Sequence, residues 1–112
     1  MPAIDLTNMT YHAEVDRATR FSIINKTVGF GNPVYITSDK KGRDATATLT
    51  DTGVLIVRDL TNKIITAYVA SVKQAMDVYK RATGNDKMPR KLWATINYNN
   101  NTEVWKKMIA VA

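Results

Sequence analysis

The feature that most constrains the fold is a series of short β-branched runs separated by brief polar turns. Residues 54–57 and 63–69 form two such runs, and residues 34–37 and 44–50 precede them. Val, Ile, Thr and Tyr are favoured in strands. Parallel strands need a crossover of about a dozen residues or more, and every connection here is shorter. The sequence therefore predicts a four-stranded antiparallel meander whose strand order follows the chain.

A helix is expected before these strands. Residues 10–26 carry apolar side chains at helical spacing, and we expect one helix there, broken near Phe21 and Ser22. Asn32 and Pro33 would then end helical structure, because the residue before a proline favours extended conformations.

Further helices are expected after the strands. Ser71 and Gln74 match a capping box, and Gly84 would end the helix that they begin. Shorter helices are predicted after Pro89 and after Thr102, with residues 97–101 interrupting them. The predicted fold class is α+β, with an N-terminal helix, a four-stranded antiparallel meander and C-terminal helices packed on the sheet.

Length and composition limit what the chain can be. Its 112 residues suit a single domain, 1–112, with a core of about 10–84 and a basic helical extension of about 85–112. The absence of cysteine excludes disulfides, thiolate metal sites and cysteine nucleophiles. No segment approaches the ~18 apolar residues of a membrane span. We therefore expect a cytoplasmic protein that has no contact with a membrane.

The positive charge is concentrated in the last third of the chain. The formal net charge is +6, and residues 1–79 carry nine basic against eight acidic residues. Residues 80–112 carry seven basic residues against Asp86 and Glu103. Such a patch is typical of a protein that binds RNA or another polyanion. It is equally typical of a solvated surface that keeps a small domain soluble. The basic residues are Lys80, Arg81, Lys87, Arg90, Lys91, Lys106 and Lys107.

Several residues could carry acid–base or phosphate chemistry. His12 is the single histidine, and on a helix Asp16 and Arg20 would share its face. The alternative is a surface histidine within a solvated ion cluster. Guanidinium groups offer paired donors to phosphate oxygens, so Arg17, Arg20, Arg43 and Arg58 are candidate phosphate ligands.

Hydroxyl and aromatic side chains add further candidates. Strand alternation places Ile64, Thr66 and Tyr68 on one face, where the two hydroxyls could line a site. Trp93 and Trp105 could stack on bases, although their apolar helical context favours burial in the core. The sequence contains no phosphate loop, dinucleotide fingerprint, zinc-protease motif or nucleophile elbow. We expect no metal and no organic cofactor.

The order of these features resembles a known superfamily. Tyr11-His12-Ala13-Glu14 with Arg17 and Arg20, then a meander, then residues 63–68 (KIITAY), resembles the barnase–EndoU–colicin–RelE superfamily of small ribonucleases and toxins. More narrowly, it is similar to small phage and mobile-element proteins. The resemblance covers about residues 11–79 and excludes the basic extension. It implies a metal-independent ribonuclease site on the sheet.

Two functions follow as hypotheses. In the first, the chain is an RNA-cleaving endoribonuclease. The resemblance implies that His12 acts as acid and base and that Arg17, Arg20 or Arg58 stabilises the charge of the phosphate. It also implies that Thr66 and Tyr68 orient the scissile group. In the second, it is a non-enzymatic phage-type protein whose basic C-terminal helices engage nucleic acid or a host protein. A homodimer through the apolar helical tail is a further alternative.

Overall fold

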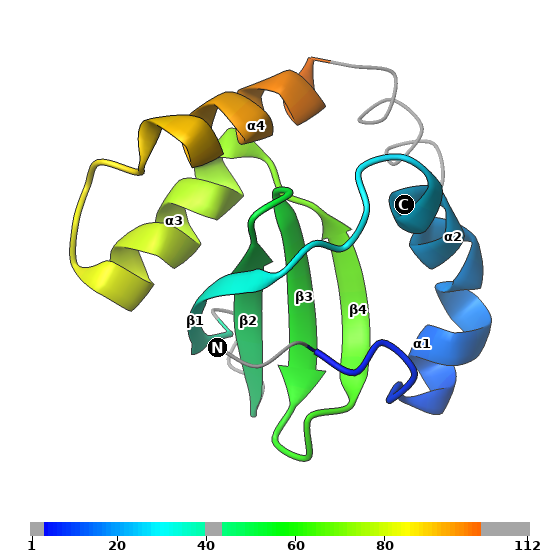
Figure 1. Ribbon diagram of the computed structural model, residues 1–112. Coiled ribbons are helices and arrows are strands. Elements are labelled where there is room, and N and C mark those ends of the chain that lie inside the picture. Colours follow the sequence, from blue (N-terminus) through cyan, green and yellow to red (C-terminus); the bar gives the residue numbers. More distant parts are fainter. Residues whose placement is uncertain (1–3, 40–43, 102–112) are drawn as a thin grey trace.

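The computed structural model describes residues 4–39 and 44–101. Figure 1 shows four strands flanked by helices near both edges of the sheet. The elements are α1 Tyr11–Asp16, α2 Ala18–Lys26, β1 Pro33–Ser38, β2 Ala45–Thr50, β3 Val54–Asp59, β4 Ile64–Val69, α3 Val72–Thr83 and α4 Arg90–Asn100.

The sheet confirms the predicted meander. Its strand order is β1-β2-β3-β4, and each neighbouring pair is antiparallel. The turn between β3 and β4 is built on Asp59, whose Oδ1 accepts hydrogen bonds from the backbone of Thr61 at 2.9 Å and of Lys63 at 3.0 Å. The carboxylate of Asp59 thus provides acceptors for backbone N–H groups of the turn, which explains why so short a connection is stable.

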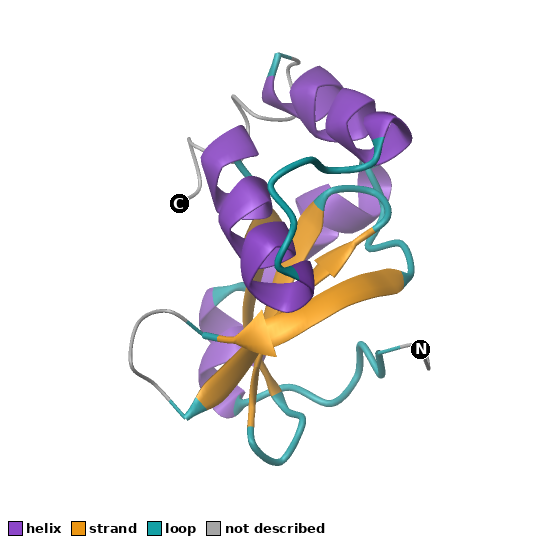
Figure 2. Ribbon diagram, turned by 90° about the vertical axis from the view of Figure 1, so that its left-hand side faces the viewer, coloured by secondary structure: helices purple, strands orange, loops and turns teal. Residues whose placement is uncertain are grey.

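Helices pack against both faces of the sheet (Figure 2). On β3, Val54 and Ile56 point into a cluster with Phe21 and Ile24 of α2. Leu55, between them, points into a second cluster that β2 shares with α3 and α4. Alternate side chains of a strand face opposite ways, so the central strand is buried on both sides. Its first four residues are all buried.

A β-bulge in β4 removes Ile64 from the face that the sequence predicted it to share with Thr66 and Tyr68. Arg58 pairs with Ile64 while its neighbour Val57 pairs with Thr66, so Ile65 is an extra residue. An inserted residue shifts the alternation of every side chain before it. Ile64 therefore packs in the same cluster as Ala67 and Val69, whereas Tyr68 packs against the opposite one.

The N-terminal helix is broken, but not where the sequence pattern predicts. The break falls at Arg17, whose φ of −112° and ψ of 6° separate α1 from α2. Phe21, near which the break was expected, is buried inside α2. Its ring meets that of Phe30 edge to face, with centroids 6.1 Å apart. The second segment is continuous through residues 21 and 22.

The caps of α3 agree with the sequence prediction. Ser71 accepts a hydrogen bond from the backbone of Gln74 at 3.1 Å, and Gln74 accepts one from the backbone of Ser71 at 2.9 Å. Gly84 ends the helix at φ 79°, in the left-handed region that glycine adopts without a steric penalty. The first cap satisfies backbone groups that a helix start leaves free.

Helix α4 continues through the asparagines that were expected to interrupt it. Their amides find carbonyl partners: Asn97 donates to Trp93 O at 2.9 Å, and Asn100 donates to Ile96 O and Ala70 O at 2.8 and 2.9 Å. Asn99, which is buried, donates to Thr52 O at 2.8 Å. Asparagine is a weak helix former because its side chain competes for backbone groups, and here that competition also ties α4 to the β2–β3 turn.

Within the described ranges, no helix has the length and apolar character needed to cross a membrane. The helix predicted after Thr102, with its apolar stripe, lies outside the described residues.

Candidate functional site

His12 lies on the exposed side of α1. Its Nδ1 is 2.6 Å from Oδ2 of Asp16, and both side chains are 57% exposed. The predicted pairing four residues apart is therefore formed. Among the described residues, no hydrogen bond or ion pair joins His12 to the other predicted catalytic residues, which are Arg17, Arg20, Arg58, Thr66 and Tyr68.

Two of the predicted residues do meet at the β4 edge of the sheet. Arg20 donates from Nη1 to Oγ1 of Thr66 at 3.3 Å. Burial lowers the pKa of the Arg20 guanidinium, and the positive charge of Arg17 lowers this pKa further. The electrostatic interaction with Tyr68 raises it. The Nε atoms of Arg17 and Arg20 are buried without a hydrogen-bond partner. Like charges held close together favour binding of an anion between them.

Arg58 lies apart from this cluster, whereas Tyr68 is close enough to Arg20 to affect its pKa. Arg58 donates to Oγ1 of the buried Thr48 at 3.4 Å, a contact between neighbouring strands. Tyr68 lines a small pocket of about 140 Å³ beneath α3, together with Asp77 and Arg81. The predicted catalytic residues are thus distributed over an exposed helix surface, a sheet edge and two faces of the sheet.

The basic residues at the end of α3 are engaged by neighbouring groups. Lys80 lies 3.2 Å from a carboxylate oxygen of Asp86. Arg81 donates to the backbone and side-chain oxygens of Ser38 at 2.6 and 3.1 Å, and it pairs with Asp77 at 3.3 Å. These contacts link the end of α3 to the end of β1.

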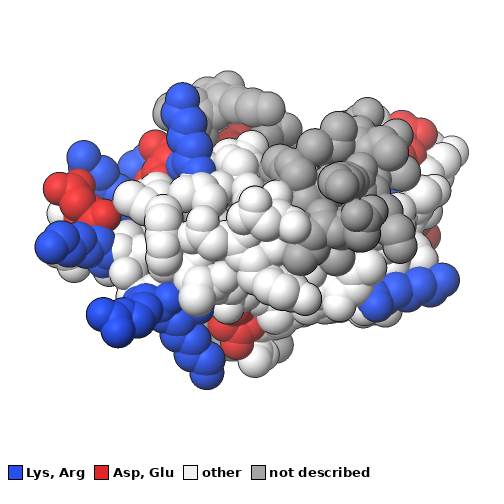
Figure 3. Space-filling model, turned by 90° about the horizontal axis from the view of Figure 1, so that it is seen from above, with Lys and Arg blue, Asp and Glu red and all other residues white. Residues whose placement is uncertain are grey.

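The basic residues before and at the start of α4 differ in this respect. Lys87, Arg90 and Lys91 are exposed and take part in no ion pair within residues 4–39 and 44–101. Figure 3 shows Lys and Arg side chains, with acidic side chains among them, at the end of the molecule where α3 and α4 are joined, beside a broad uncharged surface. Their charge is available to a partner because none of the three forms an ion pair with a carboxylate of the described residues.

Trp93 lies among these free cations and is 40% exposed, so the expected burial in the core is wrong. Leu92 and Ile96 occupy the core-facing side of α4. Adjacent residues on a helix point about 100° apart, which turns Trp93 toward solvent. Its ring lines a shallow depression of about 350 Å³ together with Met76, Met88, Asp86, Lys87 and Arg90.

Some predicted ligands cannot be placed. Arg43, Trp105, Lys106 and Lys107 lie outside the described residues.

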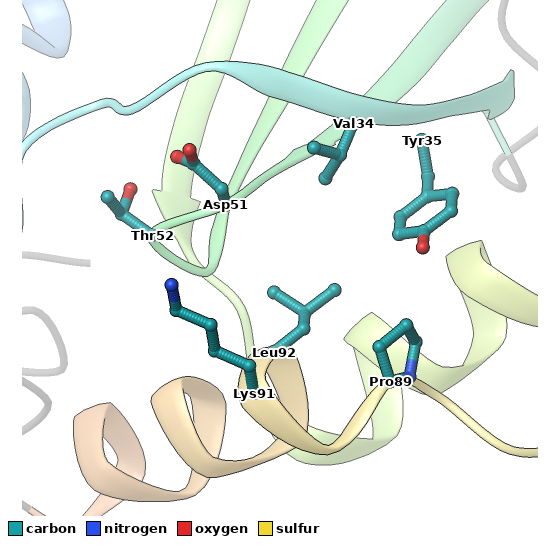
Figure 4. Close-up of a pocket in the computed structure, with 7 residues that line it drawn as sticks. All are labelled: Val34, Tyr35, Asp51, Thr52, Pro89, Lys91 and Leu92. Atoms are coloured by element: carbon teal, nitrogen blue, oxygen red, sulfur yellow. The ribbon is translucent and has the colours of Figure 1, made fainter.

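A separate pocket is lined by the predicted nucleic-acid ligand Lys91 and by residues that the sequence predicted only as turn, strand or helix positions. Asp51 and Thr52 of the β2–β3 turn face Lys91 across it, and Tyr35 lies at its other end (Figure 4). Nothing in the local sequence distinguishes Asp51 from other turn aspartates, because the pocket forms only when α4 packs beside β1.

Within the described residues, no group of three or more His, Asp or Glu side chains is placed to hold a metal ion. No protein-family model, curated protein or solved structure matches this chain.

Proposed function

We propose that this chain binds single-stranded nucleic acid, with RNA as the expected partner, across the start of α4. The observation that carries the proposal is Trp93, a large aromatic side chain exposed in a depression lined by Lys87 and Arg90. Proteins that bind single strands combine an aromatic surface for the bases with cations for the backbone. An RNA partner accords with the cytoplasmic location predicted from the sequence.

Each group has a distinct role in this proposal. A base stacks on the exposed face of Trp93, and stacking tolerates any base because every base has a π-face. The side chains of Lys87, Arg90 and Lys91 contact phosphates and release counterions. Asp86 lines the same depression, but its carboxylate is already paired with Lys80, which reduces its repulsion of a phosphate.

Replacing the tryptophan tests the proposal. Base–aromatic stacking contributes about 1–3 kcal/mol per base, so Trp93→Ala should weaken binding about fivefold to 150-fold. The assay is fluorescence anisotropy with a short labelled oligouridylate. The matched control is Tyr98→Ala, because Tyr98 is 72% exposed on the same helix and lies outside the depression. Tyr98→Ala should leave affinity unchanged.

The proposal fails if the wild-type chain does not retain the oligouridylate. It fails as well if the two alanine variants weaken binding equally, since loss of an aromatic side chain on α4 would then matter only in a general way.

Metal-independent RNA cleavage is a second candidate, supported by the close approach of Arg20 to Thr66 with Arg17 beside them. In that reaction the 2′-oxygen attacks the adjacent phosphorus while His12 takes its proton, the bond from phosphorus to the 5′-oxygen of the next nucleotide breaks, and that oxygen leaves with a proton returned by His12. The dispersal of His12 from this cluster favours binding over cleavage. Incubation of mixed RNA with the protein in EDTA tests cleavage, and activity that survives in His12→Ala would contradict the role of the histidine.

A further inference from the structure

A pocket of about 360 Å³ lies beside the first turn of α4, between that helix, β1 and the β2–β3 turn (Figure 4). This volume is in the range of small-molecule sites. Asp51, Thr52 and Lys91 lie at one end of it, and Tyr35 and Pro89 lie at the other. Val34 and Leu92 complete the apolar walls. The pocket therefore suits a flat ring that carries polar groups along one edge.

The carboxylate of Asp51 is held in place by the chain around it. Its Oδ1 accepts a hydrogen bond from the backbone of Asn32 at 2.9 Å, and its own backbone N–H donates to Asn32 O at 2.9 Å. Gly31 lies so close that an added Cβ would be 2.7 Å from Oγ1 of Thr52. The hydrogen bond from Asn32 and this close approach restrain the carboxylate of Asp51, which is otherwise exposed.

The two charged groups of the pocket have opposite signs and face each other across it, but they do not form an ion pair. Neither Asp51 nor Lys91 takes part in an ion pair within the described chain. Oγ1 of Thr52 is committed, because it donates to Gly29 O at 2.8 Å. At this end of the pocket, the groups left for a ligand are the ammonium group of Lys91 and the carboxylate of Asp51, which has about four acceptor sites of which Asn32 occupies one.

Their chemistry defines the ligand. A carboxylate can only accept hydrogen bonds, and an ammonium group can only donate them. A nucleotide has both a ring with N–H donors and an anionic phosphate. Among the four RNA bases, guanine alone presents two adjacent donors, N1–H and the N2 amino group, on its pairing edge. Adenine and cytosine present one amino group beside an acceptor nitrogen, and uracil presents one N–H between two carbonyl oxygens.

We propose that this pocket receives one base of the bound strand and selects guanine, with Asp51 accepting from its pairing edge and Lys91 contacting a neighbouring phosphate. The inference rests on the proposed binding of single strands at α4 and adds base selectivity to it. Selection follows because a base that offers one donor in place of two leaves part of the carboxylate's acceptor capacity unpaired once the ligand has excluded water.

The test compares oligouridylates that carry one central guanosine, adenosine, cytidine or uridine. A bidentate contact should favour the guanosine strand over the others by about tenfold to a hundredfold. Asp51→Asn should reduce that preference to less than about threefold, because the amide has a single acceptor oxygen. That oxygen can still accept from Asn32, so the turn is expected to be retained. Asp44→Asn, the same substitution at an exposed position outside the pocket, should keep the preference.

The outcomes separate this inference from the proposed function. Equal wild-type affinity for all four strands, or an undiminished guanosine preference in Asp51→Asn, would overturn base selection while strand binding and its dependence on Trp93 still stand. Failure of every strand to bind overturns both proposals. The wild-type comparison of four strands decides the inference even if Asp51→Asn does not fold.

Discussion

The basic residues at the end of α3 and those around the start of α4 are similar in type but differ in their surroundings. Lys80 and Arg81 have carboxylate partners, and Arg81 also binds Ser38 on another element. Lys87, Arg90 and Lys91 have no such partner in the described chain. The first pair links parts of the fold, whereas the second group leaves its charge available. The basic residues of this region therefore fall into two groups, those in ion pairs and those without one, and the amino-acid composition does not distinguish the groups.

The largest expected effect concerns the anchoring of α4, which holds the free charges in place. Ile96 is fully buried among Leu49, Leu55 and Leu92. Ile96→Ala should lower the free energy of unfolding by about 2–5 kcal/mol, as measured by urea denaturation. Ile36→Ala, at an isoleucine that is 40% exposed, is the matched control and should lose much less. Equal losses would show that α4 is not anchored through its buried face.

An intermediate effect separates paired from free arginines directly. Arg81→Gln should lower the free energy of unfolding by about 1 kcal/mol, since its hydrogen bonds to Ser38 and Asp77 are only partly screened by solvent. It should leave RNA affinity unchanged. Arg90→Gln should do the reverse, with a stability change within about 0.5 kcal/mol and weaker RNA binding. Chemical denaturation and fluorescence anisotropy on both variants provide the check. If Arg81→Gln and Arg90→Gln changed stability and RNA affinity by the same amounts, the distinction between paired and free arginines would be wrong.

The smallest effect concerns Asp59, whose carboxylate accepts hydrogen bonds from residues of its own turn. The hydrogen bond from Thr61, together with that from the backbone of Lys63, lowers the pKa of Asp59 below its usual range. The resulting stability is present above the unfolded pKa of ~3.9 and is lost as pH falls through the lower folded value. Carboxyl titration by NMR should show a higher pKa for Asp59 in Thr61→Ala than in Thr61→Ser, which keeps the hydroxyl. Equal values would contradict this cause.

Local patterns were sufficient to predict much of the fold. The meander follows from short connections, and the start and end of α3 follow from Ser71, Gln74 and Gly84. These features depend on residues close together in sequence. The bulge at Ile65 was missed because it depends on register between β3 and β4. The continuation of α4 was missed because one asparagine amide reaches Ala70, which is distant in sequence.

The candidate site was less accessible to sequence reasoning. Leu92 and Trp93 are both apolar, and only the packing of α4 decides that Leu92 is buried and Trp93 exposed. The engagement of Arg81 depends on Ser38, 43 residues away. Which cations are free could therefore be learned only from the folded chain.

The salt dependence of RNA binding tests the central claim most directly. For single strands, each phosphate contact contributes about 0.7 to the slope of log affinity against log salt. Replacing Lys87, Arg90 and Lys91 together by glutamine should flatten that slope by about 2, whereas replacing Lys80 and Arg81 by glutamine should leave it unchanged. The account would be contradicted if the triple variant kept the wild-type slope, or if the loss of Lys80 and Arg81 flattened it as much.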